Sequence, residues 1–189
     1  ASGFDLAPGL PRAEGELVDG ASHRPVQWFF DNLLPEEGAR TLLAQDAGLD
    51  AADAFGLLTR FGPESAGALT LLSAGQTLAE AKLRPLADPE LSARIRNLPR
   101  VPLDHAAPKR MSLAGAQHKL PVVALDGQLW EPVGRAASSH LLKPDHERRD
   151  DYPHSAANEW FCMQLAHACG LPVPGVALRR VPEPVYLIR

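Results

Sequence analysis

Apolar residues in the first third of the chain recur every three or four positions, the spacing of one face of a helix. Residues 39–47 show this spacing after Pro35 and two acidic residues, a combination that marks a helix start. A second helix is expected to begin at Asp50 or Asp53 and to end at Phe61, before a Gly-Pro pair. The pattern therefore predicts two adjacent helices.

The pattern changes after these helices. Residues 68–72 form a short apolar run that predicts a buried strand, so residues 26–72 are expected to form a small α/β unit. Prolines interrupt residues 73–111, which we interpret as a linker-like insertion. These patterns suggest an amino-terminal subdomain at 1–98, a linker at 99–111 and a second domain at 112–189.

The second domain alternates short apolar runs with turns. Residues 119–125 and 128–132 predict two strands joined by Asp126-Gly127, a favoured hairpin turn. A helix over residues 155–168 is expected to be capped by Ser155 and ended by Gly170, and its apolar residues cover so much of its circumference that burial is predicted. Three further strands are predicted at 139–143, 176–178 and 185–188, which gives an α+β fold with a β-rich second part.

Composition narrows the classes of function. The 189 residues are 45% hydrophobic and 22% charged, which is typical of a globular protein. The formal net charge of -4 gives no global basic field for binding nucleic acid or anionic lipid. Cys162 and Cys169 are two helical turns apart, too far for a disulfide within one helix, and no zinc-binding spacing is present. We expect a cytoplasmic protein that contains no membrane segment. The apolar run at the end of the sequence suggests a fragment of a longer protein.

Two groups of residues suggest binding of phosphate. Residues 112–119 (SLAGAQHK) form a run of small residues that enters a strand, and small side chains let backbone N–H groups approach a phosphate closely. The run is not a Walker A motif, and an ordinary tight turn is the simpler interpretation of its spacing.

The second group is Lys143, at the end of a predicted strand, and Glu159, 16 residues later on the predicted helix. Protein kinases use such a strand lysine to hold nucleotide phosphates and a helix glutamate to orient it. The alternative is that Lys143 leaves the sheet edge and Glu159 faces solvent. The charged run 145–151 is most simply a solvated loop.

These motifs together resemble the HipA-like serine/threonine kinases, the toxins of bacterial toxin–antitoxin pairs. The resemblance covers nearly the whole chain in order and spacing. It rests on residues 29–35, 112–119, 140–144, 158–159 and 170–174.

The resemblance implies a kinase-like amino-terminal lobe, with a small extra subdomain and a β-rich nucleotide-binding subdomain, and places the all-α carboxy-terminal lobe outside this chain. It implies autophosphorylation of Ser112, which switches the kinase off because a phosphoserine repels nucleotide phosphates. It implies ATP contacts from Ala114, Gly115, Ala116, Gln117, His118, Lys119 and Lys143, with Glu159 orienting Lys143. His118 departs from the family, which commonly has Glu there.

The resemblance also implies cofactors and partners. ATP and Mg²⁺ are expected, with the catalytic Asp and the Mg²⁺ ligands beyond Arg189, so this chain alone is expected to be inactive and to contain no metal site. The expected partner is a helix-turn-helix antitoxin of the HipB type, through which operator DNA is bound, and an aminoacyl-tRNA synthetase is a possible substrate. The alternative function is a non-catalytic module that docks an antitoxin or a separate kinase half.

Overall fold

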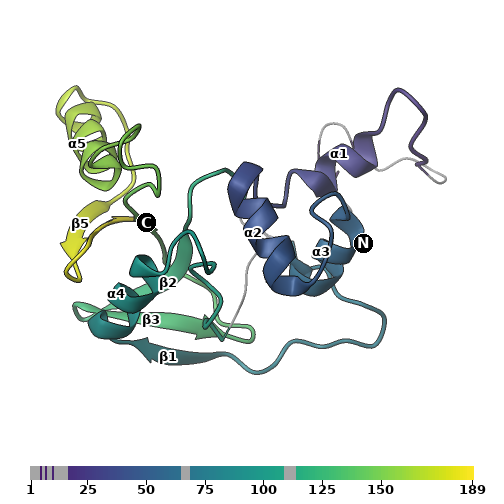
Figure 1. Ribbon diagram of the computed structural model, residues 1–189, viewed down its shortest axis with the longest axis horizontal. Coiled ribbons are helices and arrows are strands. Elements are labelled where there is room, and N and C mark those ends of the chain that lie inside the picture. The colour runs from purple at the N-terminus through teal and green to yellow at the C-terminus, as the bar shows by residue number, and fades with distance from the viewer. Residues whose placement is uncertain (1–4, 6, 8–9, 11–16, 65–68, 109–113) are drawn as a thin grey trace.

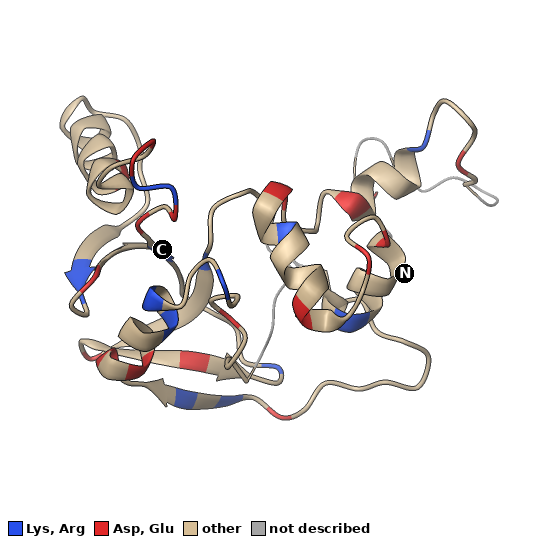
Figure 2. Ribbon diagram, in the orientation of Figure 1, with Lys and Arg blue, Asp and Glu red and all other residues tan. Residues whose placement is uncertain are grey.

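The computed structural model describes residues 5, 7, 10, 17–64, 69–108 and 114–189. Helices α1 to α3 gather at one end of the molecule and a sheet with α4 and α5 forms the other (Figure 1). Positive and negative residues are interspersed over both ends (Figure 2). No described helix has the length and apolar character needed to cross a membrane.

The helical end is built from α1 (Pro25–Asp31), α2 (Glu37–Ala47) and α3 (Ala54–Phe61). Gly48 ends α2 with a φ of 68°, and the Asp53 carboxylate caps α3 by accepting the Gly56 N–H at 2.8 Å, as the sequence predicts. The core of this end combines apolar side chains from all three helices and the segments between them. Its fully enclosed members are Leu34, Leu43, Ala44, Leu57, Leu58 and Phe61.

The predicted strand at 68–72 is wrong: residue 68 lies outside the described residues, and residues 69–72 have no regular structure. Leu71 instead packs on the helical core, and its N–H donates to the Gly62 carbonyl at 2.9 Å. An apolar run of this length can bury itself against helices as well as in a sheet. The described part of this subdomain is therefore helical rather than α/β.

The sheet has six antiparallel strands in the order β1-β3-β2-β4-β6-β5. The predicted hairpin between β2 and β3 is present, with positive φ at both Asp126 and Gly127. The strand bounds are β1 (Lys82–Leu86), β2 (Leu120–Leu125), β3 (Gln128–Val133), β4 (His140–Pro144), β5 (Val176–Arg180) and β6 (Pro184–Ile188).

Residues 73–111 are not the loose insertion that the prolines suggest, where the structure describes them. They contain β1, which pairs with β3, and α4 (Asp88–Arg96). Leu91 and Ile95 of α4 join the core of the sheet, and Leu103 from the expected linker is only 2% exposed within it. The described residues from β1 to Leu103 therefore pack with the sheet.

Helix α5 (Ser155–Ala168) contacts β4, β5 and β6 and has the predicted bounds. Its predicted burial is wrong, because Ala156 is its one buried residue and Phe161 is 59% exposed. Ser155 is not the cap either: its hydroxyl accepts the His146 N–H, and the Asp145 carboxylate accepts the Ala156 N–H at 3.0 Å. A carboxylate from the preceding loop thus takes the capping role.

Candidate functional site

Lys143 and Glu159 form an ion pair on the face of the sheet that α5 covers. Lys143 lies in β4, and its Nζ donates to Glu159 Oε2 of α5 at 2.7 Å. The neighbouring strand places Tyr186 opposite Lys143, with the ammonium 5.9 Å from the ring centroid. The pairing that the 16-residue spacing suggests is therefore present, and the alternative in which Glu159 faces solvent is excluded.

The small-residue bend precedes β2. Gly115 has a φ of +98°, where residues with a side chain are strained, and a Cβ there would lie 2.8 Å from Lys119 Nζ. Lys119 folds back so that its ammonium donates to the Ala114 carbonyl. The bend over residues 114–119 therefore needs glycine for its backbone conformation, and a Cβ at this position would displace the flexible end of the Lys119 side chain.

The bend and Lys143 lie on the same side of the sheet. Leu120 of β2 is paired with Leu142 of β4, so continuing this antiparallel register by one residue sets Lys119 opposite Lys143. Directly opposite residues point to the same face of a sheet. The Gln117 amide also donates to the Pro144 carbonyl at 3.2 Å, which ties the bend to the end of β4.

Two lysines set opposite each other repel. Burial is the largest cause that lowers the pKa of Lys119, and the charge of Lys143 lowers it further, against the weaker opposing effects of Glu36 and Glu159. A bound polyanion would offset the repulsion between the two ammonium groups. The electrostatics of the site therefore favour a ligand with several negative charges.

The charged loop 145–151 is not simply solvated. Glu147 Oε2 lies 2.7 Å from His118 Nε2, and these side chains are 25% and 11% exposed. Asp145 caps α5, as described above, and Arg148 pairs with Asp151 at the loop surface. The loop thus joins the bend on one side to the helix that carries Glu159 on the other.

The helical end also touches the bend. Pro35 forms a parallel bridge with Gly115, and the Glu36 N–H donates to the Gly115 carbonyl at 3.5 Å. Pro35 is therefore not the first residue of α2, which begins two residues later. A proline has no N–H to donate, and the hydrogen bond at this bridge comes from the Glu36 N–H instead.

Sequence reasoning missed Tyr186, Glu147 and Glu36 as members of this site. A tyrosine within the apolar run of β6 was the available signal for the first, because a buried polar tip needs a partner. The two glutamates give no comparable signal, since each lies in a run of charged residues. Ser112, the expected autophosphorylation site, lies outside the described residues.

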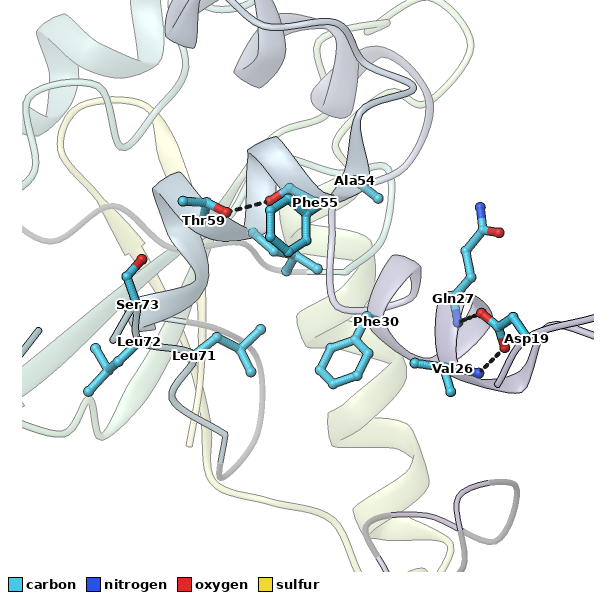
Figure 3. Close-up of a pocket in the computed structure, with 11 residues that line it drawn as sticks. Asp19, Val26, Gln27, Phe30, Ala54, Phe55, Thr59, Leu71, Leu72 and Ser73 are labelled. Atoms are coloured by element: carbon cyan, nitrogen blue, oxygen red, sulfur yellow. Dashed lines mark hydrogen bonds between the residues drawn. The ribbon is translucent and has the colours of Figure 1, made fainter. Parts of the chain in front are cut away.

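A larger cavity of about 500 Å³ lies at the helical end, between α1, α3 and residues 71–73 (Figure 3). Its walls are mostly apolar, from side chains such as Phe30, Phe55 and Leu72. Its one acid, Asp19, caps α1 by accepting the N–H groups of Val26 and Gln27. This cavity offers no group for acid–base or phosphate chemistry, so the lysine pair is the better candidate site.

A strand lysine that is paired with a helix glutamate beside a small-residue bend is typical of the nucleotide-binding lobe of kinases. The family comparisons agree with this class. The family model of the HipA N-terminal domain matches residues 1–72, and that of the HipA-like C-terminal domain matches residues 111–189, which together make up most of the chain. The chain belongs to the HipA-like family.

Two relatives and one solved structure are similar to the chain. The chain is 40% identical to "Putative kinase Y4mE" of Sinorhizobium fredii over 97% of its own length and 44% of that protein. It is 30% identical to the serine/threonine-protein kinase toxin HipA of Shewanella oneidensis, over 93% of the chain and 38% of that protein. A chain in the Shewanella oneidensis MR-1 complex of HipA, HipB and operator DNA is similar in fold, with a TM-score of 0.73 and 27% identity over all of this chain and 42% of that one. This chain therefore spans less than half the length of these relatives.

Proposed function

We propose that this chain is the amino-terminal part of a HipA-like protein serine/threonine kinase toxin and that its lysine site binds the phosphates of ATP. The observation that carries the proposal is the 2.7 Å ion pair between Lys143 and Glu159, set beside the bend with Lys119. The cavity at the helical end, by comparison, is lined by no lysine.

Each residue of the site has a physical task in this proposal. Lys143 neutralises phosphate oxygens, and Glu159 fixes the direction of its ammonium, because an unpaired lysine side chain samples many rotamers. Gly115 and its small neighbours Ala114 and Ala116 let the backbone approach the phosphates. Lys119 supplies a second ammonium group, and a bound anion would offset its repulsion from Lys143.

The described residues of the site do not supply a set of ligands for Mg²⁺. Among the described residues there is no group of three or more His, Cys, Asp and Glu side chains that could hold a metal ion. Mg²⁺ bridges phosphate oxygens and neutralises their charge when it is bound in kinases. We propose that its protein ligands and the catalytic base come from parts of the protein other than the described residues.

The relatives support further parts of the proposal. The structural neighbour contains HipB and operator DNA, which supports an antitoxin of the HipB type as partner and contact with DNA through it. Autophosphorylation of Ser112 would place a doubly charged group next to the bend, where it would compete with the phosphates of ATP. An aminoacyl-tRNA synthetase remains the proposed class of substrate.

Replacement of Lys143 by Ala in the full-length protein tests the proposal. Charge-assisted hydrogen bonds contribute about 1.5–3 kcal/mol, so the dissociation constant for ATP should rise roughly 10- to 150-fold. Autophosphorylation, measured by intact mass, should disappear. Lys82→Ala removes an exposed lysine from β1 and is the matched control, which should bind ATP as the wild type does. Equal ATP affinity in Lys143→Ala and wild type would contradict the proposal.

A further inference from the structure

The Glu147 carboxylate lies between the bend and the first turn of α2. Its Oε2 is 2.7 Å from His118 Nε2, within the bend. Its Oε1 lies beside Gly38, where an added Cβ would come within 3.8 Å of it. Its own backbone belongs to the loop that continues from the lysine strand β4. One carboxylate therefore faces the bend, the first turn of α2 and the segment that follows Lys143.

The surroundings suit a carboxylate at this point. The first turn of a helix carries partial positive charge, which favours an anion beside Gly38. His118 supplies a ring nitrogen on the other side, and its side chain is 11% exposed. The Glu147 side chain is 25% exposed, so the contact is partly shielded from solvent.

The bend is held by its side chains as well as by its backbone. Gln117 donates to the Pro144 carbonyl, His118 contacts Glu147, and Lys119 donates to the Ala114 carbonyl. Of these contacts only that of His118 reaches the side chain of another loop. His118 is engaged at Glu147 in this structure, so it can act on the bend without itself contacting ATP.

We infer that His118 and Glu147 are a positioning pair, which acts on nucleotide binding by fixing the bend beside Lys143 and not by touching the nucleotide. This inference rests on the proposed function, because it assumes that the bend receives phosphates. It predicts that loss of either partner releases the bend and weakens binding of the phosphate tail, while contacts to the nucleoside stay as they are.

The test compares ATP and adenosine as competitors of a fluorescent ATP analogue on the full-length protein. Glu147→Gln and His118→Gln should each weaken ATP binding about tenfold, with adenosine affinity unchanged. The double variant should bind ATP no more weakly than the single variant with the lower ATP affinity, because the two residues act through one contact. Asp151→Asn breaks an ion pair in the same loop and is the matched control, with ATP affinity as in wild type.

Three outcomes would overturn the inference. Unchanged ATP affinity in Glu147→Gln, an equal loss for adenosine, or additive losses in the double variant each contradict a positioning pair. If Glu147→Gln does not fold, Glu147→Asp keeps the charge and withdraws it from His118, and the same results are expected. Lys143→Ala, measured in parallel, separates the two proposals. If Lys143→Ala loses ATP binding while Glu147→Gln does not, only this inference fails. If Lys143→Ala keeps ATP binding, the proposed function and this inference fail together.

Discussion

Two arginines and two glutamates form a charged network where α4 crosses the strands β1 and β3, whose charged segments are visible in Figure 2. Glu131 of β3 is 1% exposed and accepts a hydrogen bond from Arg94 Nη1 at 2.6 Å and one from Arg84 Nε at 2.9 Å. Glu90 completes the network by accepting from Arg84 at 2.8 Å. Because Glu131 is the buried centre, it is the residue whose removal should cost most.

The loss of stability in Glu131→Gln follows from the charge that this variant leaves without a buried partner. The amide can still accept one hydrogen bond, but Arg94, itself 8% exposed, then keeps only the half-exposed Glu90 as a counter-charge. Removal of one partner of a buried ion pair costs about 3–5 kcal/mol. For a chain of this length that free energy corresponds to a fall of roughly 6–20 °C in the melting temperature.

Urea unfolding of the wild type and of three variants measures the effect. Glu131→Gln should lower the free energy of unfolding by at least about 3 kcal/mol, and the double variant Glu131→Leu/Arg94→Met by less, because it leaves no buried charge unpaired. Asp151→Asn, which opens an exposed pair, should cost less than about 1 kcal/mol. A loss below about 1 kcal/mol for Glu131→Gln would refute the reasoning, because it would mean that the network is not desolvated.

Two further predictions concern acid and the bend. Burial raises the pKa of Glu90, but hydrogen bonds from Arg84 and Arg94 outweigh this effect and hold the pKa below its ordinary value of 4.5. The ionised Glu90 should therefore stabilise the fold above that pH, and this stabilisation should be lost as the pH falls through the lower pKa of the folded state. Urea unfolding between pH 7 and pH 3 should show a steeper loss of stability with acid in the wild type than in Glu90→Gln. Gly115→Ala and Gly75→Ala both force a side chain into positive φ, and each should lower the free energy of unfolding by about 1–2 kcal/mol. Only Gly115→Ala crowds Lys119, so only this variant should also weaken ATP binding. Equal ATP affinity in the two variants would contradict the role of the bend.

The parts of the fold that local chemistry decides were predictable. Asp126-Gly127 specifies its hairpin because both residues tolerate positive φ, and Gly48 ends α2 for the same reason. Helix α5 was placed with its correct bounds from Ser155, its apolar residues and Gly170, although Ser155 is its first residue and not its cap. Each of these signals lies within a few residues of the feature it determines.

The failures come from contacts between distant segments. β1 contains two basic residues and Pro85 in five positions, so it resembles a linker until β3 supplies its partner about 45 residues later. Glu131 of β3 and Glu90 of α4 then neutralise Arg84, which no local pattern reveals. Phe161 shows the opposite error, because an apolar residue on a helix does not say whether the described chain contains the surface that would bury it.

The site divides in the same way. The spacing of Lys143 and Glu159 was readable because a strand followed by a helix fixes which residues can meet. The position of Lys119 opposite Lys143 was not, because the register of β2 against β4 is set by the pairing of Leu120 with Leu142 and not by a short turn. That register is nevertheless the most informative feature of the site. Like charges placed opposite each other on a sheet destabilise it, and an anion between the two ammonium groups would offset that cost.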